Sequence, residues 1–243
     1  MGLVRYIAPL LFIIAVPIAL ITTNVRLAVN EPRIYEYVTD EYDTPQKTGI
    51  EREELLRASG ELRDYFNSNN DESIFVSVQR NGAPITLFNP RETAHLHDVK
   101  RLFQLSFRVQ EVAVLFVLVY VVTVFIWAKE GTYRSLARQV LTSGLVTLVV
   151  VGAFGVVAVS GFEGAFTQFH LIAFDNDLWK LNPATDRLIQ MFPEAFWQDV
   201  SIWVVLATLA EIGALGMFSA VYLRATRSSR VTVRLAAGEQ PFS

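Results

Sequence analysis

The sequence predicts an α-helical integral membrane protein with four transmembrane helices and a small extracytoplasmic α+β cap. Three observations lead to this fold class. Hydrophobic residues make up 52% of the 243-residue chain. They gather in four runs, each near the ~20 apolar residues that cross a bilayer as a helix. Between these runs lie two long polar segments, which contain all three histidines.

The four apolar runs give the expected spans, in residues 1–27, 109–128, 140–160 and 200–224. The first run follows a short basic start, as a signal peptide does. Its apolar core is longer than a usual signal core, and no clear small-x-small cleavage site follows it. We therefore interpret the first run as an uncleaved membrane anchor.

The short loops predict the orientation of the spans. The loop at residues 129–139, KEGTYRSLARQ, has three basic residues and one acid, and RATRSSRVTVR after the fourth span has four arginines. By the positive-inside rule, this loop and the tail at residues 225–243 are expected to be cytoplasmic, as are both termini. Residues 28–108 and 161–199 are then extracytoplasmic.

The longer outer segment predicts two helices and a hairpin. The stretch GIEREELLRASGELRDYFNSNND has apolar residues at helical spacing. The next stretch, SIFVSVQRNGAPITLFNP, has two strand-like runs around Asn81 and Gly82, a pair typical of tight hairpin turns. A second helix is expected from about Glu92 to Phe103 or beyond. These elements would form the cap.

Two histidines lie close together in the stretch RETAHLHDVK, at positions 95 and 97. In a helix, His95 and Asp98 share a face, so the carboxylate could accept one ring N–H and leave the other nitrogen as a base. His97 would point elsewhere, as a surface histidine. On a strand, His95 and His97 could instead bind zinc together with His170, but the helical pattern makes that geometry poor.

The shorter outer segment is rich in aromatic residues. Such rings often form belts at the membrane interface, which is a purely structural explanation. Polar residues at positions 175–177 and 186 lie among these rings, however, and a belt does not need them. A pocket that binds substrate is the alternative, and its expected rings are Phe166, Phe169, Phe174 and Trp179.

Composition excludes some kinds of chemistry. The chain has no cysteine, so it has neither disulfides nor a thiol nucleophile. Its net charge of −3 is nearly balanced, and nothing in the sequence favours nucleic-acid binding. From the residues alone we expect a possible acid/base site at the lipid interface.

Three stretches identify a family. GIEREELL, ETAHLHDVKRLF and FHLIAFDNDLWKLNPATDRLIQMFPEAFW resemble the bacterial lipoprotein intramolecular transacylase family. The resemblance covers about residues 1–225, including the order of the spans. The third stretch is long and fairly specific.

The resemblance implies an acyltransferase of the bacterial cell membrane, with its active site on the extracytoplasmic side. Such an enzyme moves the sn-2 acyl chain of a diacylglyceryl-cysteine lipoprotein to the N-terminal amine of the same protein, giving a lyso-form lipoprotein. Its catalytic histidines would be His95 and His170. The implied partners are diacylated lipoproteins and membrane lipids, and no cofactor or metal ion is expected.

Further expectations depend on this resemblance. The predicted supporting residues are Asp98, Lys100, Asn176 and Asp177; Lys100 and Asn176 would contact the substrate carbonyl. To bring His95 near the lipid, a bend is expected between Gln104 and Gln110. The alternative function is a non-enzymatic lipid-binding or accessory protein, for which His95 and His170 would lie far apart.

Overall fold

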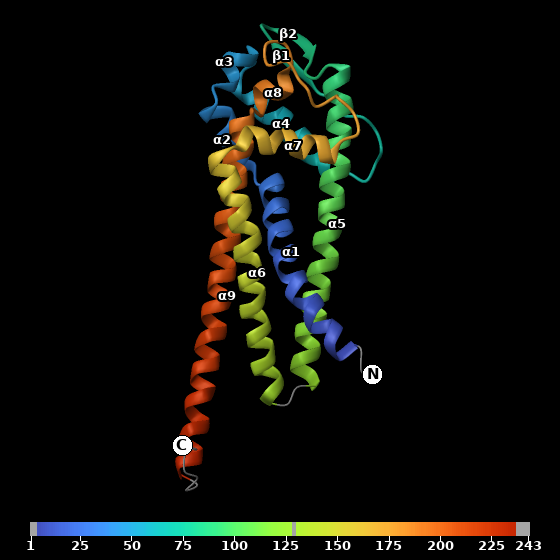
Figure 1. Cartoon of the computed structure of the whole chain (residues 1–243). Coiled ribbons are helices and arrows are strands. Elements are labelled where there is room, and N and C mark those ends of the chain that lie inside the picture. The colour runs from blue at the N-terminus through green and yellow to red at the C-terminus, as the bar shows by residue number, and fades with distance from the viewer. Residues whose placement is uncertain (1–3, 128–129, 237–243) are drawn as a thin grey trace. The chain divides into compact units, whose positions relative to one another are not determined.

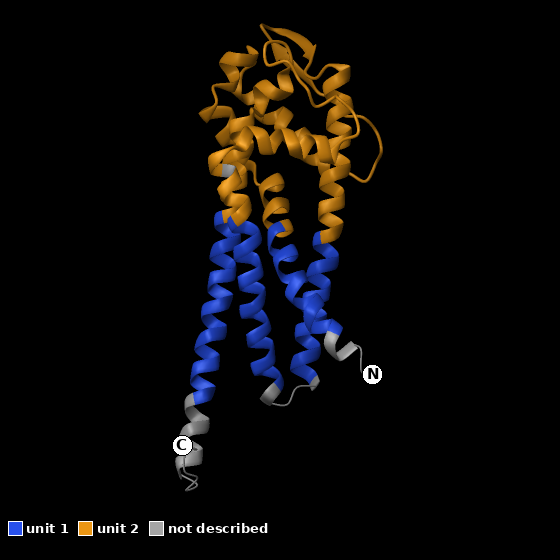
Figure 2. Ribbon diagram, viewed as in Figure 1, with its two compact units in different colours: residues 1–21, 110–152, 206–243 blue, residues 22–109, 153–205 orange. Residues whose placement is uncertain are grey.

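The computed structural model describes residues 4–127 and 130–236 of the chain (Figure 1). Contacts divide the chain into two compact units (Figure 2). The first unit consists of residues 1–21, 110–152 and 206–243, and the second of residues 22–109 and 153–205. Residues 1–3 of the first expected span, residue 128 at the end of the second, residue 129 at the start of the expected cytoplasmic loop and residues 237–243 of the expected tail lie outside the described residues.

Four of the described helices are long and apolar enough to cross a membrane. They are α1 (Val4–Asn30), α5 (Pro90–Trp127), α6 (Glu130–Ser160) and α9 (Glu194–Ala236). Helices suit a bilayer because each satisfies its own backbone hydrogen bonds. Large apolar side chains such as Leu115, Val149 and Phe218 are exposed on them, as expected for surfaces that face lipid. The prediction of four membrane-spanning helices is confirmed.

The first unit is held together by a small cluster of apolar side chains. Phe12, Val16 and Ile212 are buried there. The Phe12 ring stacks on Tyr120, with 4.6 Å between ring centroids. The Tyr120 hydroxyl donates a hydrogen bond of 2.8 Å to Gln139 Oε1, which links α5 to α6.

The second unit contains the remaining elements. Its short helices are α2 (Pro32–Glu41), α3 (Thr44–Thr48), α4 (Arg52–Asn67), α7 (Phe162–Ala173) and α8 (Arg187–Met191). One apolar core joins α2, α4 and α8 to the first part of α5 and the start of α9. Its fully buried members include Leu55, Val78, Leu87, Leu96 and Met191.

The predicted hairpin is confirmed. Strand β1 (Ser77–Arg80) pairs antiparallel with β2 (Ala83–Thr86), and Val78 lies opposite Ile85. Asn81 and Gly82 connect the strands with φ angles of 53° and 77°. Positive φ at both central residues is the geometry of a type I′ turn, which Asn-Gly adopts most readily.

The predicted bend in α5 is wrong, because the helix runs without interruption from Pro90 to Trp127. The stretch QLSFRVQ at residues 104–110 contains neither proline nor glycine, so nothing in it ends or kinks a helix. Phe107 in this stretch is buried in the core of the second unit, which also favours regular helix.

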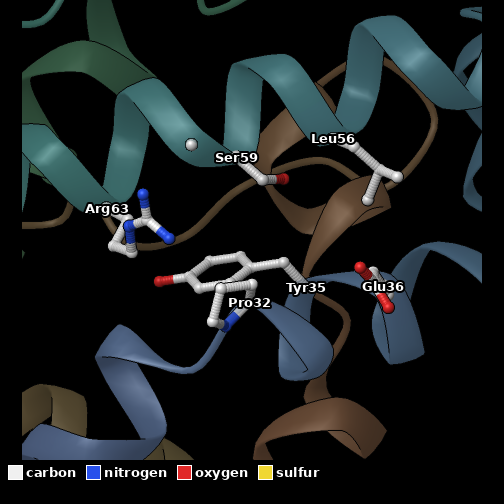
Figure 3. A pocket seen from close by; sticks show the side chains of 7 residues that line it. Pro32, Tyr35, Glu36, Leu56, Ser59 and Arg63 are labelled. Atoms are coloured by element: carbon white, nitrogen blue, oxygen red, sulfur yellow. The ribbon is translucent and has the colours of Figure 1, made fainter.

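A small cavity of about 150 Å³ lies between α2 and α4. Figure 3 shows the Tyr35 ring below α4, with Ser59 and Arg63 projecting from that helix. The Tyr35 hydroxyl donates a hydrogen bond of 2.6 Å to the Val29 carbonyl. None of the predicted site residues lines this cavity. Its residues fix α2 against α4, and we assign them a structural role.

Candidate active site

The first turn of α5 is anchored by a reciprocal cap. The Asn89 N–H donates to Glu92 Oε2 at 2.7 Å, and the Glu92 N–H donates to Asn89 Oδ1 at 3.0 Å. This is a capping box, and Pro90 occupies the first helical position, where no N–H is needed. Glu92 Oε1 also accepts the Leu188 N–H at 2.6 Å. The turn that positions His95 is thereby joined to α8.

The ring of His170 has a defined tautomer. His170 lies in the last turn of α7, and its Nδ1 is 2.7 Å from the carbonyl oxygen of Phe166. A carbonyl oxygen only accepts, so in this hydrogen bond Nδ1 is the nitrogen with the proton. In the neutral ring, Nε2 is then unprotonated and can accept a proton.

The two histidines predicted to be catalytic lie together. The ring centroids of His95 and His170 are 6.0 Å apart, and the residues are only 6% and 7% exposed. The accessory-protein alternative expected them far apart. Two helices distant in sequence, α5 and α7, thus present their imidazoles to one buried region.

The aromatic residues predicted to bind substrate surround this pair. Ring centroids of Phe166, Phe169, Phe174 and Trp179 lie 4.3, 5.3, 5.6 and 4.9 Å from that of His170. Phe174 also lies 5.1 Å from the ring of His95. The histidines therefore sit in an aromatic enclosure and are largely shielded from solvent.

Burial lowers the basicity of both histidines. It lowers the pKa of His95 to about 4, and the neighbouring His170 contributes in the same direction. Burial also lowers the pKa of His170, although the hydrogen bond to the Phe166 carbonyl opposes this shift. Removing an imidazolium from water is unfavourable, so both rings are neutral near pH 7.

Asp98 does not hold His95 as we expected. Its Oδ2 instead accepts a hydrogen bond of 2.9 Å from Asn176 Nδ2. His95 Nδ1 is buried without a hydrogen-bond partner among the described residues. The hydrogen bond between Asp98 and Asn176 thus joins the loop after α7 to α5. Of the two buried histidines, only His170 has a hydrogen bond that defines its tautomer, the one to the Phe166 carbonyl.

Lys100 has partners other than the expected carbonyl of a substrate. Its ammonium is buried and donates to Ser68 Oγ, to the Asn70 carbonyl and to Asn70 Oδ1, at 2.6–3.0 Å. It also lies 4.2 Å from the centroid of the Tyr65 ring. Lys100 therefore fixes the loop after α4 to α5, which is a structural role.

Asp177, predicted as a supporting residue, lies in the loop after α7 and contacts Lys180 and Arg91. Its Oδ1 lies 2.7 Å from Lys180 Nζ, and its carbonyl accepts a hydrogen bond of 2.6 Å from Arg91. Arg91 also reaches the Leu178 carbonyl at 3.4 Å. We did not single out Arg91 or Glu92 from the sequence. Both residues could have been considered, since they lie in RETAHLHDVK, the same stretch as His95.

His97 lies outside the enclosure, as predicted for a surface histidine. Its Nε2 is 2.9 Å from Asp71 Oδ1, in the loop that follows α4. Over the described part of the chain, no group of three or more histidine, aspartate or glutamate side chains has metal-binding geometry. The alternative zinc site, which required His97 beside His95 and His170, has no support in this arrangement.

An apolar groove begins at the aromatic enclosure. It has a volume of about 340 Å³, and it is lined by Thr22, Val25, Leu102, Phe103, Leu105, Ser106, Val109 and Phe169. Phe169 is the immediate neighbour of His170 in α7. Phe169 therefore belongs to both the aromatic enclosure and the groove, which runs along α5 from Leu102 to Val109 with an apolar surface that suits a hydrocarbon chain.

Comparisons with known proteins agree with this arrangement. The family model described as lipoprotein intramolecular transacylase Lit matches residues 10–197. An uncharacterised protein of Aquifex aeolicus (strain VF5) is 29% identical over 220 residues, which are 89% of this chain and 94% of the relative.

Solved structures of one membrane protein share the fold. The membrane-integral lipoprotein intramolecular transacylase Lit from Bacillus cereus matches with a TM-score of 0.78 at 17% identity, over 94% of this chain and 100% of that chain. A variant of the same protein, with one histidine replaced by arginine, matches with a TM-score of 0.71 at 17% identity, over 92% and 93% of the two chains.

The family model covers more than half of the chain and includes both buried histidines. The four apolar helices agree with a multi-pass membrane protein. This chain belongs to the lipoprotein intramolecular transacylase family and is a membrane enzyme of that class.

Proposed function

We propose that this enzyme transfers the sn-2 acyl chain of a diacylglyceryl-cysteine lipoprotein to the N-terminal amine of the same molecule. The product is an N-acylated lyso-form lipoprotein. The observation that supports this proposal most is the buried pair His95 and His170, with 6.0 Å between ring centroids and one tautomer defined. No covalent acyl-enzyme is needed, because nucleophile and ester belong to one substrate.

His170 is the general base in this mechanism. Its Nε2 takes a proton from the amine as the nitrogen attacks the ester carbonyl, which gives a tetrahedral intermediate. The hydrogen bond from Nδ1 to the Phe166 carbonyl stabilises the imidazolium that results. When the intermediate collapses, the bond to the glyceryl oxygen breaks, and His170 returns the proton to that oxygen.

His95 acts as a neutral partner. With a pKa of about 4, His95 remains uncharged at neutral pH. It can therefore donate a hydrogen bond to the substrate, and it is too weak a base to take the proton that His170 has accepted. A neutral imidazole in a site of low polarity stabilises developing negative charge on a carbonyl oxygen. This assignment reverses our expectation that His95 is the base.

Enclosure of the substrate is the second contribution of the site. The transition state closes a medium-sized ring between the amine and the ester, and such rings form reluctantly. Holding the two ends together can contribute several orders of magnitude in rate. The aromatic rings around His170 supply such confinement, and the groove beside Phe169 accommodates an acyl chain.

Lipid reaches the site without a bend in α5. The apolar groove extends along α5 from Val109 to Leu102, and it also includes Phe169 of α7. Phe169, Leu171 and Ile172 are 48%, 53% and 83% exposed, so α7 presents an apolar surface next to His170. Helices with such surfaces lie in the membrane interface. An acyl chain could therefore extend from the membrane to the histidines.

The proposed location follows from charge. The basic loop near residue 134 and the arginine-rich end of α9 are cytoplasmic, together with both termini. Residues 28–108 and 161–199 are then extracytoplasmic, and the site that they contain faces the side of the bacterial cell membrane where lipoproteins are anchored. Diacylated lipoproteins and membrane lipids are its partners.

Product analysis tests the reaction. A diacylated lipoprotein is co-expressed with the wild-type enzyme or with the double variant His95→Ala/His170→Ala. Intramolecular transfer conserves mass, so tandem mass spectrometry must locate the acyl chain on a fragment that contains the cysteine nitrogen. We expect N-acylation with the wild type only. An acyl chain that stays on the glyceryl oxygen in both samples contradicts the proposal.

The pH dependence follows from the lowered pKa values. A free N-terminal amine titrates at about 7.7–8.0, whereas both histidines are neutral well below that pH. Under subsaturating conditions the rate should rise about tenfold per pH unit from about pH 6.5 and level off above about pH 8. The rate of lyso-form production from a synthetic diacylated lipopeptide in proteoliposomes measures this profile. A plateau already at pH 6.5 would mean that amine deprotonation does not limit the reaction.

A further inference from the structure

The indole N–H of Trp179 has no hydrogen-bond partner in the part of the chain that the structure describes. Trp179 Nε1 is buried and makes no hydrogen bond to any described residue. An indole nitrogen is a donor only, and buried tryptophans usually place it against an acceptor. A buried donor without an acceptor lowers stability, so its presence at a functional site calls for an explanation.

This donor belongs to the ring cluster around the catalytic histidines. The indole lies on His170, with 4.9 Å between ring centroids and 32° between ring planes. His95, which also contacts the His170 ring, likewise has a buried nitrogen without a described partner, Nδ1. Two unpartnered polar atoms thus occur among the residues that enclose the reaction site.

The loop that contains Trp179 is held in place. Arg91 donates to the Asp177 carbonyl at 2.6 Å, and Asn176 donates to Asp98 at 2.9 Å. The Lys180 ammonium pairs with Asp177 and lies 5.4 Å from the centroid of the indole ring. A donor fixed before the reaction stabilises developing charge without a cost of reorganisation.

Other donors expected at the site have partners already. Lys100 donates to Ser68 and Asn70, and the Asn176 amide donates to Asp98. Lys100 has three N–H donors and three acceptors, so it cannot serve a substrate carbonyl without giving up a contact, and one of the two amide N–H donors of Asn176 is committed to Asp98. The Trp179 N–H, like His95 Nδ1, is buried and has no hydrogen-bond partner among the described residues, so it is a second uncommitted group beside the histidine already assigned to that oxygen.

We propose that Trp179 is a catalytic residue that donates a hydrogen bond from Nε1 to the carbonyl oxygen of the transferred acyl group. This inference rests on the proposed transfer reaction. The amine lone pair forms the new N–C bond while the carbonyl electron pair moves onto oxygen. The indole N–H stabilises that oxyanion and keeps its proton. The electron pair then re-forms the carbonyl as the bond to the glyceryl oxygen breaks.

Replacement by phenylalanine tests this role. Trp179→Phe keeps an aromatic ring against His170 but removes the N–H. Removing one oxyanion donor typically lowers kcat by about 10²–10³-fold, so we expect that loss with little change in KM. The assay follows N-acylation of a synthetic diacylated lipopeptide in proteoliposomes. The matched control is Trp203→Phe, whose ring contacts Tyr37 and none of the site rings; it should retain the wild-type rate.

A second variant separates the N–H from the shape of the ring. Incorporation of β-(3-benzothienyl)alanine at position 179 replaces the N–H by sulfur and retains a bicyclic ring that can pack on His170. We expect the same loss of kcat as in Trp179→Phe. A wild-type kcat in this variant overturns the inference, and so does a higher KM at unchanged kcat, since Trp179 would then be only an apolar wall. If the wild type itself transfers no acyl chain, the proposed reaction fails, which is a different result.

Discussion

Asparagine at position 170 should lower the transfer rate by about 10²–10⁴-fold, the usual contribution of a general base. An amide can keep a hydrogen bond to the Phe166 carbonyl, but it cannot take a proton from the attacking amine. The loss should therefore appear in kcat, with substrate binding largely retained. The measurement is the rate of N-acylation of a diacylated lipopeptide in proteoliposomes.

The matched control for His170→Asn is His97→Asn. His97 contacts Asp71 outside the aromatic enclosure, so the same change there should leave the rate within about twofold of wild type. A His170→Asn enzyme with a nearly unchanged rate would show that another group accepts the proton. Thermal unfolding of each variant establishes that the comparison is made between folded proteins.

Of the substitutions proposed for this chain, Glu92→Ala should lower the free energy of unfolding most. The residue is 1% exposed, and its carboxyl oxygens accept the backbone N–H groups of Asn89 and Leu188. Alanine would leave both donors unsatisfied, at about 1–3 kcal/mol each. For a chain of this length we expect a Tm lower by roughly 10 °C, because 1 kcal/mol corresponds to about 2–4 °C.

Tryptophan fluorescence in detergent measures the unfolding of Glu92→Ala. The control Glu41→Ala removes an exposed carboxylate at the end of α2 and should change the free energy of unfolding by less than about 0.5 kcal/mol. Glu92→Gln keeps an acceptor oxygen and should lie between alanine and wild type. Equal Tm values for the wild type and Glu92→Ala would mean that the contacts of Glu92 do not stabilise the second unit.

The sequence predicts those features of the fold that depend on residues close together in the chain. Apolar runs identified the four long helices, and the turn preference of Asn81 and Gly82 identified the hairpin. The bend in α5 was predicted because the proposed reaction requires His95 to lie near the lipid. No residue between positions 104 and 110 could cause such a bend. The uninterrupted helix shows that local sequence was the better guide there.

The partners of the site residues could not be predicted in the same way. Helical spacing places Asp98 on the same face as His95, yet Asp98 binds Asn176, which is 78 residues away in the chain. Lys100 likewise is bound by residues 68 and 70, in a loop that periodicity does not describe. Periodicity relates residues within one helix, whereas these contacts depend on how distant loops pack against it.

The contact between His170 and the Phe166 carbonyl has a consequence for the fate of the proton. Many catalytic histidines are supported by a carboxylate, whose full negative charge makes the imidazolium long-lived. A neutral carbonyl stabilises that cation less, and burial disfavours it further. The protonated enzyme should therefore be a short-lived species that releases its proton quickly to the departing glyceryl oxygen. In the proposed mechanism, such a site would favour completion of the transfer over loss of the proton to bulk water, and each turnover would end with the enzyme in its starting charge state.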